Sequence, residues 1–500
     1  MDVAEYSEEV PLEREEALIL PFLQECSVQV FTQIYPTVQI CILLTVFEQI
    51  LRWLILRFSR SLRGIKFMQI VTILFGFIAL YDNQSESLKF LTTYASLVLF
   101  LHILYSRFTS LVKEMKILIL VLGLSSGYFY AESFLTPEEW HKSRGTFMII
   151  SMKMYSVLYD LHVNSKDEYK KETFLMSLNI IGYIFNPATV VMGPWISFGQ
   201  FIRSTGQCQC INLSFKKIIA NILTGLAHIL SSIGFILCST CLQEILYDFL
   251  PETRWTEAYL NSQAFRMGHY FVSFLSTGYL YTSGYLTTID RASLDKCKCF
   301  EKIFNIHDKT SLSMKGERYP IVDPLEIEMP RSLTRVVTHW NFSMHVWLKN
   351  YVYKSAREYG RFFAIISTYL ISSLIHGLNF QIMSVLVSIG LYAYLDYIFR
   401  DLLSCYLDAC VRSFSCLPGC TIHRNKSRSI IAVLVNGLLG LLAMFHLAYL
   451  AVVFDSSETM EQGYDKEHVF EKWSYLGFIS HKVFLANLTV YFILKCFKRQ

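Results

Sequence analysis

The chain has 500 residues, of which 53% are hydrophobic and 17% are charged, and its formal net charge is +4. An average soluble domain carries about 25% charged residues, so this composition argues against an ordinary soluble protein. The small net charge, without a basic cluster interleaved with aromatic residues, also argues against a nucleic-acid partner. The apolar residues fall in runs long enough to cross a hydrocarbon core of about 30 Å as helices. We therefore expect an all-α polytopic membrane protein surrounded by membrane lipid.

Residues 1–35 form an acidic N-terminal segment without a basic region before an apolar core, so no cleavable signal peptide is expected. A first span is expected at about 36–56, and four basic residues follow it within the next ten positions. The positive-inside rule places this basic loop in the cytoplasm. The N-terminal segment is therefore expected in the lumen.

Hydropathy predicts further spans along the rest of the chain. They lie at about 67–81, 88–105, 117–134, 218–238, 265–287, 361–380, 381–399, 430–454 and 474–494. The loop 400–428 and the C-terminal end are basic and are expected in the cytoplasm. An odd number of crossings, about 9–11, fits this orientation, and 36–500 reads as one domain because no repeat or linker divides it. Asn83 heads a glycosylation sequon in a loop expected in the lumen.

Between residues 140 and 201 the apolar pattern is interrupted. Pro187 and Gly193-Pro194 break helix continuity, because proline lacks an amide donor and restricts the residue before it. Irregular backbone at membrane depth must be buried in protein or line a cavity, so a cavity wall is expected here. Trp195 then stands at a corner beside a tunnel.

Three charged residues lie on the membrane-like stretch before that break. They are Arg144, Lys153 and Asp160. The basic pair suits the phosphates of an acyl-CoA. An internal charge network that compensates burial explains the three residues equally well, and the sequence leaves both interpretations open.

The stretch 331–380 carries the candidate catalytic residues, Asn341 and His376. A histidine inside an apolar span is a functional hypothesis by default. Acyl transfer from a thioester needs a base for the attacking hydroxyl, which suits His376, and a donor for the developing oxyanion, which suits the neutral amide of Asn341. Aromatic residues flanking Asn341 are expected to line an apolar tunnel for the acyl chain: Trp340, Trp347, Tyr351 and Tyr353.

The Trp340-Asn341 pair, with His376 following Asn341 by 35 positions in a polytopic chain, resembles the membrane-bound O-acyltransferase family. The segments GPWISF and PRSL…WLKNYV resemble its members that acylate Wnt proteins. The resemblance implies transmembrane and re-entrant helices around a central tunnel, with a catalytic core at about 140–400. It also implies an endoplasmic-reticulum location, palmitoleoyl-CoA as co-substrate without a further cofactor, and a serine on a Wnt hairpin as acceptor.

Two alternatives remain. One is a member of the same family that acylates a lysophospholipid, against which the two Wnt-acylating segments argue. The other is a non-catalytic membrane protein that binds lipid or Wnt. A carrier predicts internal symmetry or several charged residues along a path through the membrane, and the late spans have almost none.

Other histidines and cysteines support less specific predictions. His446, inside a late apolar span, is expected to form an inter-helix hydrogen bond. A group in the basic loop could supply zinc ligands, although its spacing matches no strong zinc signature: Cys405, Cys410, Cys416, Cys420 and His423. We favour solvated or S-acylated thiols there and expect no metal. The thirteen cysteines as a whole do not suggest a secreted disulfide framework.

Overall fold

A computed structural model describes residues 12–58, 61–105, 116–163, 173–205, 214–286, 321–377, 379–416, 420–454 and 466–497. Regular structure within these ranges is helical, as the composition predicts, apart from one isolated bridge between Ala409 and Asn425. The first half contains α1 (Leu12–Phe58), α2 (Leu62–Gln84), α3 (Leu88–Tyr105), α5 (Lys116–Phe134), α6 (Pro137–Val163), α7 (Thr173–Ile184), α8 (Pro187–Val190), α9 (Phe198–Ser204), α10 (Phe215–Ser239), α11 (Cys241–Phe249) and α12 (Arg254–Thr282).

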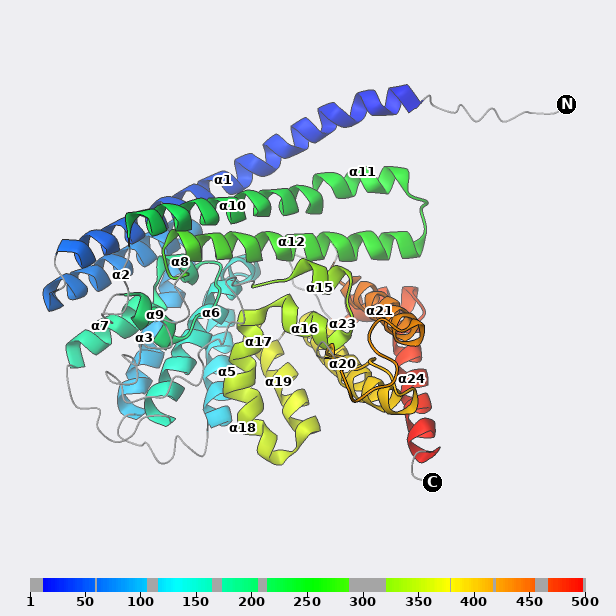
Figure 1. The fold of residues 1–500 in the computed structure, drawn as a ribbon. Helices are drawn as coiled ribbons and strands as arrows, with labels where there is room; N and C mark the ends of the chain where they lie inside the picture. Colours follow the sequence, from blue (N-terminus) through cyan, green and yellow to red (C-terminus); the bar gives the residue numbers. More distant parts are fainter. Residues whose placement is uncertain are drawn as a thin grey trace.

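The second half begins with short helices and ends with long ones (Figure 1). It contains α15 (Pro324–Glu328), α16 (Leu333–Trp340), α17 (Phe342–Leu348), the π-helix η1 (Lys349–Tyr353), α18 (Lys354–Ala356), the 3₁₀ turn η2 (Arg357–Tyr359), α19 (Arg361–Ile375), α20 (Phe380–Tyr406), α21 (Ile430–Ala451), α23 (Lys466–Tyr475) and α24 (Ile479–Phe497). Ser and Asn side chains cap several of these helices, which satisfies amide groups that a helix N-terminus leaves open.

Five stretches of helix among the described residues are long and apolar enough to cross a membrane. They are Ile19–Phe58, Leu62–Gln84, Phe215–Phe249, Phe380–Tyr406 and Ile430–Ala451. The pair α23 and α24, bent by 75°, makes a sixth if it is counted as one span. The chain is therefore a multi-pass helical membrane protein. In the described part of the chain, fewer helices than the nine to eleven expected crossings are both long and apolar enough to span a membrane.

The remaining expected spans also coincide with helices. They are α3, α5, α12 and α19. α19 has only 15 residues, and α12 carries serine, threonine and arginine side chains that are buried against other helices. Hydropathy undercounts such interior helices because their polar residues face protein and not lipid.

Helices α1, α10 and α12 lie alongside one another in one layer (Figure 1). α1 continues without a break through Pro36, so the helix begins well before the expected first span. Gly225 of α10 and Gly278 of α12 face each other, and a Cβ on Gly278 would lie 2.9 Å from the Gly225 carbonyl oxygen. Small residues allow this close approach of two membrane helices.

Among the described residues, a disulfide between Cys26 and Cys241 links α1 to the start of α11, the helix that follows α10. The layer also contains a buried ion pair within the expected first span, which sequence reasoning did not single out. Glu48 accepts hydrogen bonds from Arg52 at 2.9 Å and from the Tyr285 hydroxyl at 2.7 Å. Because the charges are paired and hydrogen-bonded, the network links α1 to the segment after α12 without an isolated buried charge.

The interrupted region after α7 is enclosed by protein. Residues 185–191 and 193–199 are buried, and the Tyr183 hydroxyl donates to the Ile196 carbonyl at 2.6 Å. Trp195 is 1% exposed and donates through Nε1 to the Ser156 hydroxyl of α6 at 3.2 Å. Irregular backbone therefore occurs here where protein covers it, as the bilayer requires.

Candidate active site

His376 lies at a sharp corner between α19 and α20. The apolar run was expected to stay helical to residue 380, but α19 ends at Ile375 and His376 is its C-cap residue. Gly377 follows with φ of +92°, a left-handed conformation that ends the helix. Asn379 then caps α20 by accepting a hydrogen bond from the Ile382 amide at 3.2 Å. The corner places the imidazole at a helix end and not along a helix face.

The corner packs against α6. A Cβ added to Gly377 would lie 2.7 Å from Cζ2 of Trp140, which is closer than real Cβ contacts allow. Glycine is therefore required here for two reasons, the positive φ and the proximity of the indole ring. The dipeptide His376-Gly377 thus acts as one unit, in which the glycine positions the histidine.

The imidazole of His376 is partly buried, and Arg144 and His269 are the groups that act on it electrostatically. It makes no hydrogen bond to any residue that the structure describes. A base must be able to receive a proton from substrate, and an imidazole nitrogen without a protein partner meets that requirement.

Asn341 interrupts the helix between α16 and α17, with φ of −145° and ψ of 89°. Its side-chain oxygen accepts a hydrogen bond from the Met344 amide at 3.0 Å, which caps α17. This bond assigns the orientation of the amide, because only the oxygen can accept. The NH₂ group, which makes no hydrogen bond within the described part of the chain, is left as a donor.

His269 of α12 packs against Trp340, the residue before Asn341. Its Nε2 lies 2.7 Å from the carbonyl oxygen of Trp340, and its ring stacks on the Trp340 indole with centroids 4.3 Å apart. It also acts electrostatically on His376. Sequence reasoning missed this histidine, although the rule that flagged His376, an ionisable side chain within an expected span, applies to it equally.

The break between α16 and α17 at Asn341 is stabilised by hydrogen bonds to residues 321–328, which precede α16. The Phe342 amide donates to the Ile321 carbonyl at 2.8 Å, and the Asp323 amide donates to the His339 carbonyl at 3.1 Å. Glu326 of α15 pairs with Arg335 of α16, and this hydrogen-bonded guanidinium holds the pKa of the carboxyl below its usual value. The backbone is therefore hydrogen-bonded to this segment both before and after Asn341.

The aromatic residues after Asn341 pack into a cluster with α6. Trp347 and Tyr351 are fully buried, and Trp347 Nε1 donates to the Met152 carbonyl at 3.0 Å. Tyr155 has its ring centroid 5.8 Å from Trp347 and 6.1 Å from Tyr351. Tyr353 is only partly buried. These residues form a packed wall, and their contact with an acyl chain stays a prediction.

The three charged residues of α6 occupy different surroundings. Lys153 is fully buried and donates to the Thr189 hydroxyl at 2.7 Å and to the Ile184 carbonyl at 3.1 Å. Asp160 accepts from the Tyr351 hydroxyl at 2.9 Å. These bonds favour an internal network for Lys153 and Asp160, whereas Arg144 lies near His376.

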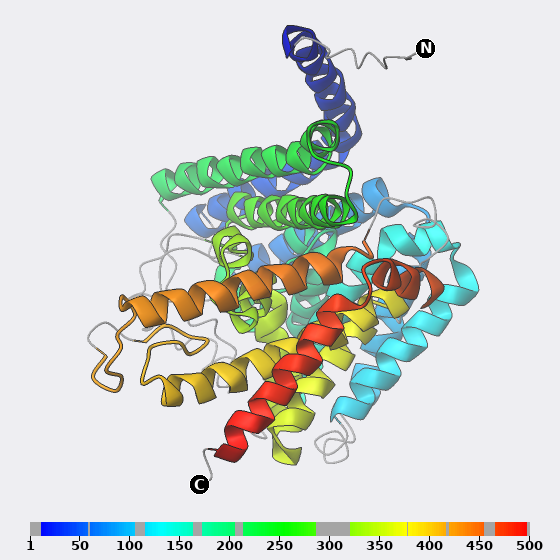
Figure 2. The ribbon, with the colours of Figure 1, turned by 90° about the vertical axis from the view of Figure 1, so that its right-hand side faces the viewer.

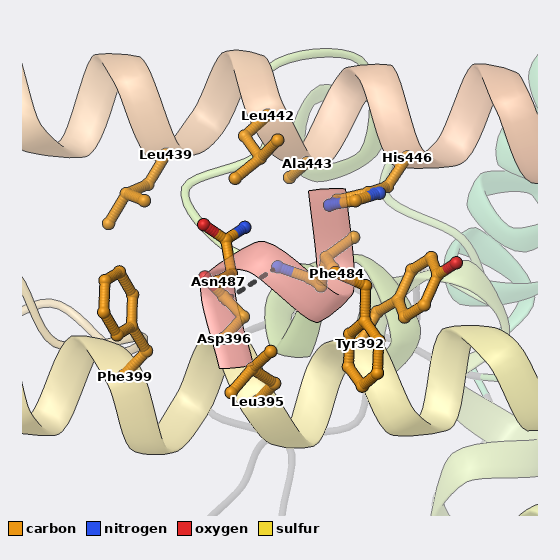
Figure 3. Close-up of a pocket in the computed structure, with 11 residues that line it drawn as sticks. Tyr392, Leu395, Asp396, Phe399, Leu439, Leu442, Ala443, His446, Phe484 and Asn487 are labelled. Atoms are coloured by element: carbon orange, nitrogen blue, oxygen red, sulfur yellow. Dashed lines mark hydrogen bonds between the residues drawn. The ribbon is translucent and has the colours of Figure 1, made fainter. Parts of the chain in front are cut away.

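An apolar pocket lies elsewhere, between α20, α21 and α24 (Figure 3). His446 is at its edge, and its Nδ1 lies 2.6 Å from the Ser480 hydroxyl of α24. Asp396 at the other side accepts from the Leu333 amide at 3.2 Å. Neither His376 nor Asn341 lines this pocket. The expected inter-helix hydrogen bond of His446 is thus confirmed.

The Asn83 side chain donates to the Ala79 carbonyl at 2.7 Å within the last turn of α2. Its use as a glycosylation site stays a prediction. Cys405 lies on α20, and the other three cysteines of the basic group lie after it, away from the His376 corner in sequence.

Comparison with known proteins identifies the family and several relatives of this chain. The pattern of the MBOAT, membrane-bound O-acyltransferase family, matches residues 62–404. The chain is 31% identical over 371 residues to the protein-serine O-palmitoleoyltransferase porcupine of Anopheles gambiae, which covers 72% of this chain and 70% of that protein. The porcupine proteins of Homo sapiens and Mus musculus are 33% and 32% identical over 367 residues, each covering 69% of this chain and 72% of theirs.

A more distant similarity is confined to a short stretch. Lysophospholipid acyltransferase 2 of Arabidopsis thaliana is 32% identical over 74 residues, which is 14% of this chain. The family pattern, by contrast, covers α2 to α20 and includes both Asn341 and His376. The chain belongs to the membrane-bound O-acyltransferase family.

Proposed function

We propose that this protein is a protein-serine O-palmitoleoyltransferase that transfers a palmitoleoyl group from palmitoleoyl-CoA to a serine of Wnt proteins, so that they can be secreted and signal. The extent of similarity supports this function, because the relatives with that activity in their names align over about 70% of the chain. A lysophospholipid acceptor has support from only 74 residues.

In this proposal His376 is the general base. Its free imidazole nitrogen takes the proton of the serine hydroxyl as the serine oxygen attacks the thioester carbonyl. The NH₂ group of Asn341 donates to the carbonyl oxygen as it becomes negative. Collapse of the intermediate breaks the carbon–sulfur bond, and the thiolate of CoA takes the proton from His376. The products are the serine ester and CoA thiol.

The observation that carries this assignment is the state of the two polar groups. The acceptor end of the Asn341 amide is occupied by the Met344 amide, whereas its donor end is open. The His376 ring likewise lacks a hydrogen-bond partner among the described residues. A purely structural role would favour polar groups paired within the protein, whereas these two side chains are only partly buried and keep a donor and a ring nitrogen for substrate.

We further propose an endoplasmic-reticulum membrane location with the N-terminus in the lumen and the C-terminus in the cytoplasm. The Cys26–Cys241 disulfide supports this orientation. Cys26 lies in α1 before the expected first span, and Cys241 lies just after the expected span 218–238. The positive-inside rule assigns both positions to the lumen, and disulfides persist in that oxidising compartment. The acyl donor then enters from the cytosol, and the Wnt hairpin enters from the lumen.

The test is an acyl-transfer assay with purified full-length protein in lipid nanodiscs. The donor is alkyne-tagged palmitoleoyl-CoA, and the acceptor is a disulfide-bonded Wnt hairpin peptide that carries one serine. Label on this peptide, but not on its serine-to-alanine analogue, is expected from wild-type protein and not from His376→Ala. Label on lysophosphatidylcholine in place of the peptide would overturn the proposed acceptor.

A further inference from the structure

The described residues between α20 and α21, 407–416 and 420–429, bring four metal-ligating side chains to one point. They are Cys410, Cys416, Cys420 and His423, and their ligand atoms all lie within 4.8 Å of one another. Cys410 and His423 are buried, while the other two are partly buried. We call these four residues the Cys–His cluster. Cys405, which the sequence grouped with them, is exposed on α20 and lies outside the cluster.

The three sulfur-to-nitrogen distances within the cluster are nearly equal. The sulfur atoms of Cys410, Cys416 and Cys420 lie 3.6, 3.7 and 3.6 Å from Nδ1 of His423. In a tetrahedral zinc site, with Zn–S of about 2.3 Å and Zn–N of about 2.0–2.1 Å, a sulfur and a nitrogen ligand are about 3.5–3.6 Å apart. The four donors are therefore spaced like ligands of one shared tetrahedral cation.

Other uses of these cysteines do not explain the arrangement. Cys410, Cys416 and Cys420 are unpaired, whereas a disulfide would bring two sulfurs to about 2.05 Å and leave the third and the histidine without a role. S-acylation needs a single accessible thiol and does not require three thiols to converge on one imidazole nitrogen. A shared ligand requires that convergence.

Groups around the cluster suit a metal–thiolate centre. The backbone amides of Ile422 and His423 stabilise the thiolate form of Cys420, and such outer interactions support thiolate ligands. Three thiolates and one divalent cation leave one negative charge. The guanidinium of Arg331 interacts electrostatically with Cys410 and Cys416 and so compensates that charge.

We propose that the Cys–His cluster is a structural Zn²⁺ site with three cysteine ligands and one histidine ligand. Thiolate ligands in a tetrahedral arrangement favour zinc over harder divalent cations. Protein donors fill all four positions, so no position is open for substrate or water, as in structural rather than catalytic zinc sites. This site is independent of the acyltransferase chemistry at His376.

The site has an identifiable mechanical role. The amide of Cys410 donates to the Asn425 carbonyl at 2.9 Å, which closes the base of the loop. Arg331 donates to the Cys410 carbonyl at 2.8 Å, and the Ser332 hydroxyl donates to the Ser413 carbonyl at 3.2 Å. Ser332 caps α16, the helix that ends at Asn341. The zinc-bound loop thus anchors the start of the helix that leads to the candidate active site.

The first test measures metal in the purified full-length protein. Wild type is expected to carry about one zinc per chain by elemental mass spectrometry. Cys416→Ser and His423→Ala are expected to lose most of it, and Cys405→Ser, a matched control outside the cluster, is expected to keep it. Equal zinc content in all four proteins would overturn the assignment. It would also be overturned if wild-type protein were purified without zinc and bound none when Zn²⁺ was added.

The second test uses wild-type protein and does not depend on the variants folding. After zinc is removed with a chelator, Co²⁺ is added, and thiolate-to-cobalt charge-transfer bands with the intense visible bands of tetrahedral cobalt are expected. Intact-protein mass spectrometry is run in parallel. Weak octahedral cobalt bands, or acyl groups on the cluster cysteines in the isolated protein, would contradict the proposal.

Discussion

His376 and His446 both lie in apolar helical surroundings, yet they are held in opposite ways. His446 is 4% exposed, sits inside α21, and is bonded to Ser480 of the neighbouring α24 at 2.6 Å. His376 lies at the end of α19, is partly buried, and makes no hydrogen bond to the described residues. In Figure 2 α21 (orange) meets α24 (red) at the end of α24 that lies away from the C-terminus.

The difference fits the roles proposed for them, a structural one for His446 and a reactive one for His376. A histidine bonded to a serine contributes to packing, because its polar nitrogen is satisfied by the protein. A histidine placed at a corner by Gly377 and the Trp140 ring keeps a nitrogen available for a substrate proton. Each prediction below tests this contrast, beginning with the largest expected effect.

Replacing His376 with glutamine is expected to lower acyl transfer about 10²- to 10⁴-fold, which is the usual contribution of a general base. The variant is expected to keep the melting temperature of wild type, because the ring makes no hydrogen bond within the described chain. Initial rates and a thermal melt measure the two effects. A variant that unfolds early but transfers at the wild-type rate when folded would reverse the roles assigned to the two histidines.

Two substitutions of Asn341 can distinguish its role in capping α17 from its role as a hydrogen-bond donor to the oxyanion. Asn341→Ala is expected to lose about 10²- to 10³-fold in rate, as for an oxyanion donor, together with about 1 kcal/mol of stability from the lost cap. Asn341→Ser can still cap α17, so it is expected to lose the rate but keep the stability. Rates and melts on both variants provide the measurement. If serine restored the rate as well, capping alone would explain the residue.

Gly377→Ala is expected to reduce the rate about tenfold or more by moving the His376 corner. The positive φ costs about 1–3 kcal/mol for a non-glycine residue, and the new Cβ meets the Trp140 ring. The double variant Gly377→Ala with Trp140→Leu relieves only the steric part and is expected to recover part of the rate. Wild-type turnover by Gly377→Ala would show that the position of the corner does not govern catalysis.

His446→Leu is expected to leave the transfer rate of folded protein near that of wild type and to cost about 1–3 kcal/mol of stability. The cost arises because Ser480 loses its partner in a buried site. Adding Ser480→Ala is expected to recover part of the melting temperature. A large fall in rate without a change in melting temperature would place His446 among the functional residues.

The sequence alone determined the membrane class and the approximate positions of the helices, and it named Asn341 and His376 as the candidate catalytic pair. Apolar run length is a local property, since each helix satisfies its own backbone groups in lipid. An ionisable residue in such a run is costly wherever the chain folds, so His376 stood out without coordinates. His269 had the same signal and was overlooked.

Only the tertiary structure decided which polar groups are paired and which are open. The Ser480 partner of His446, the Trp140 wall behind Gly377 and the Thr189 partner of Lys153 come from other helices. The Cys–His cluster likewise depended on loop geometry, because its spacing is not a familiar metal signature. Contacts between helices are fixed by packing of the whole bundle and not by local pattern. For that reason the sequence could name candidate residues but could not tell a free imidazole from a bonded one.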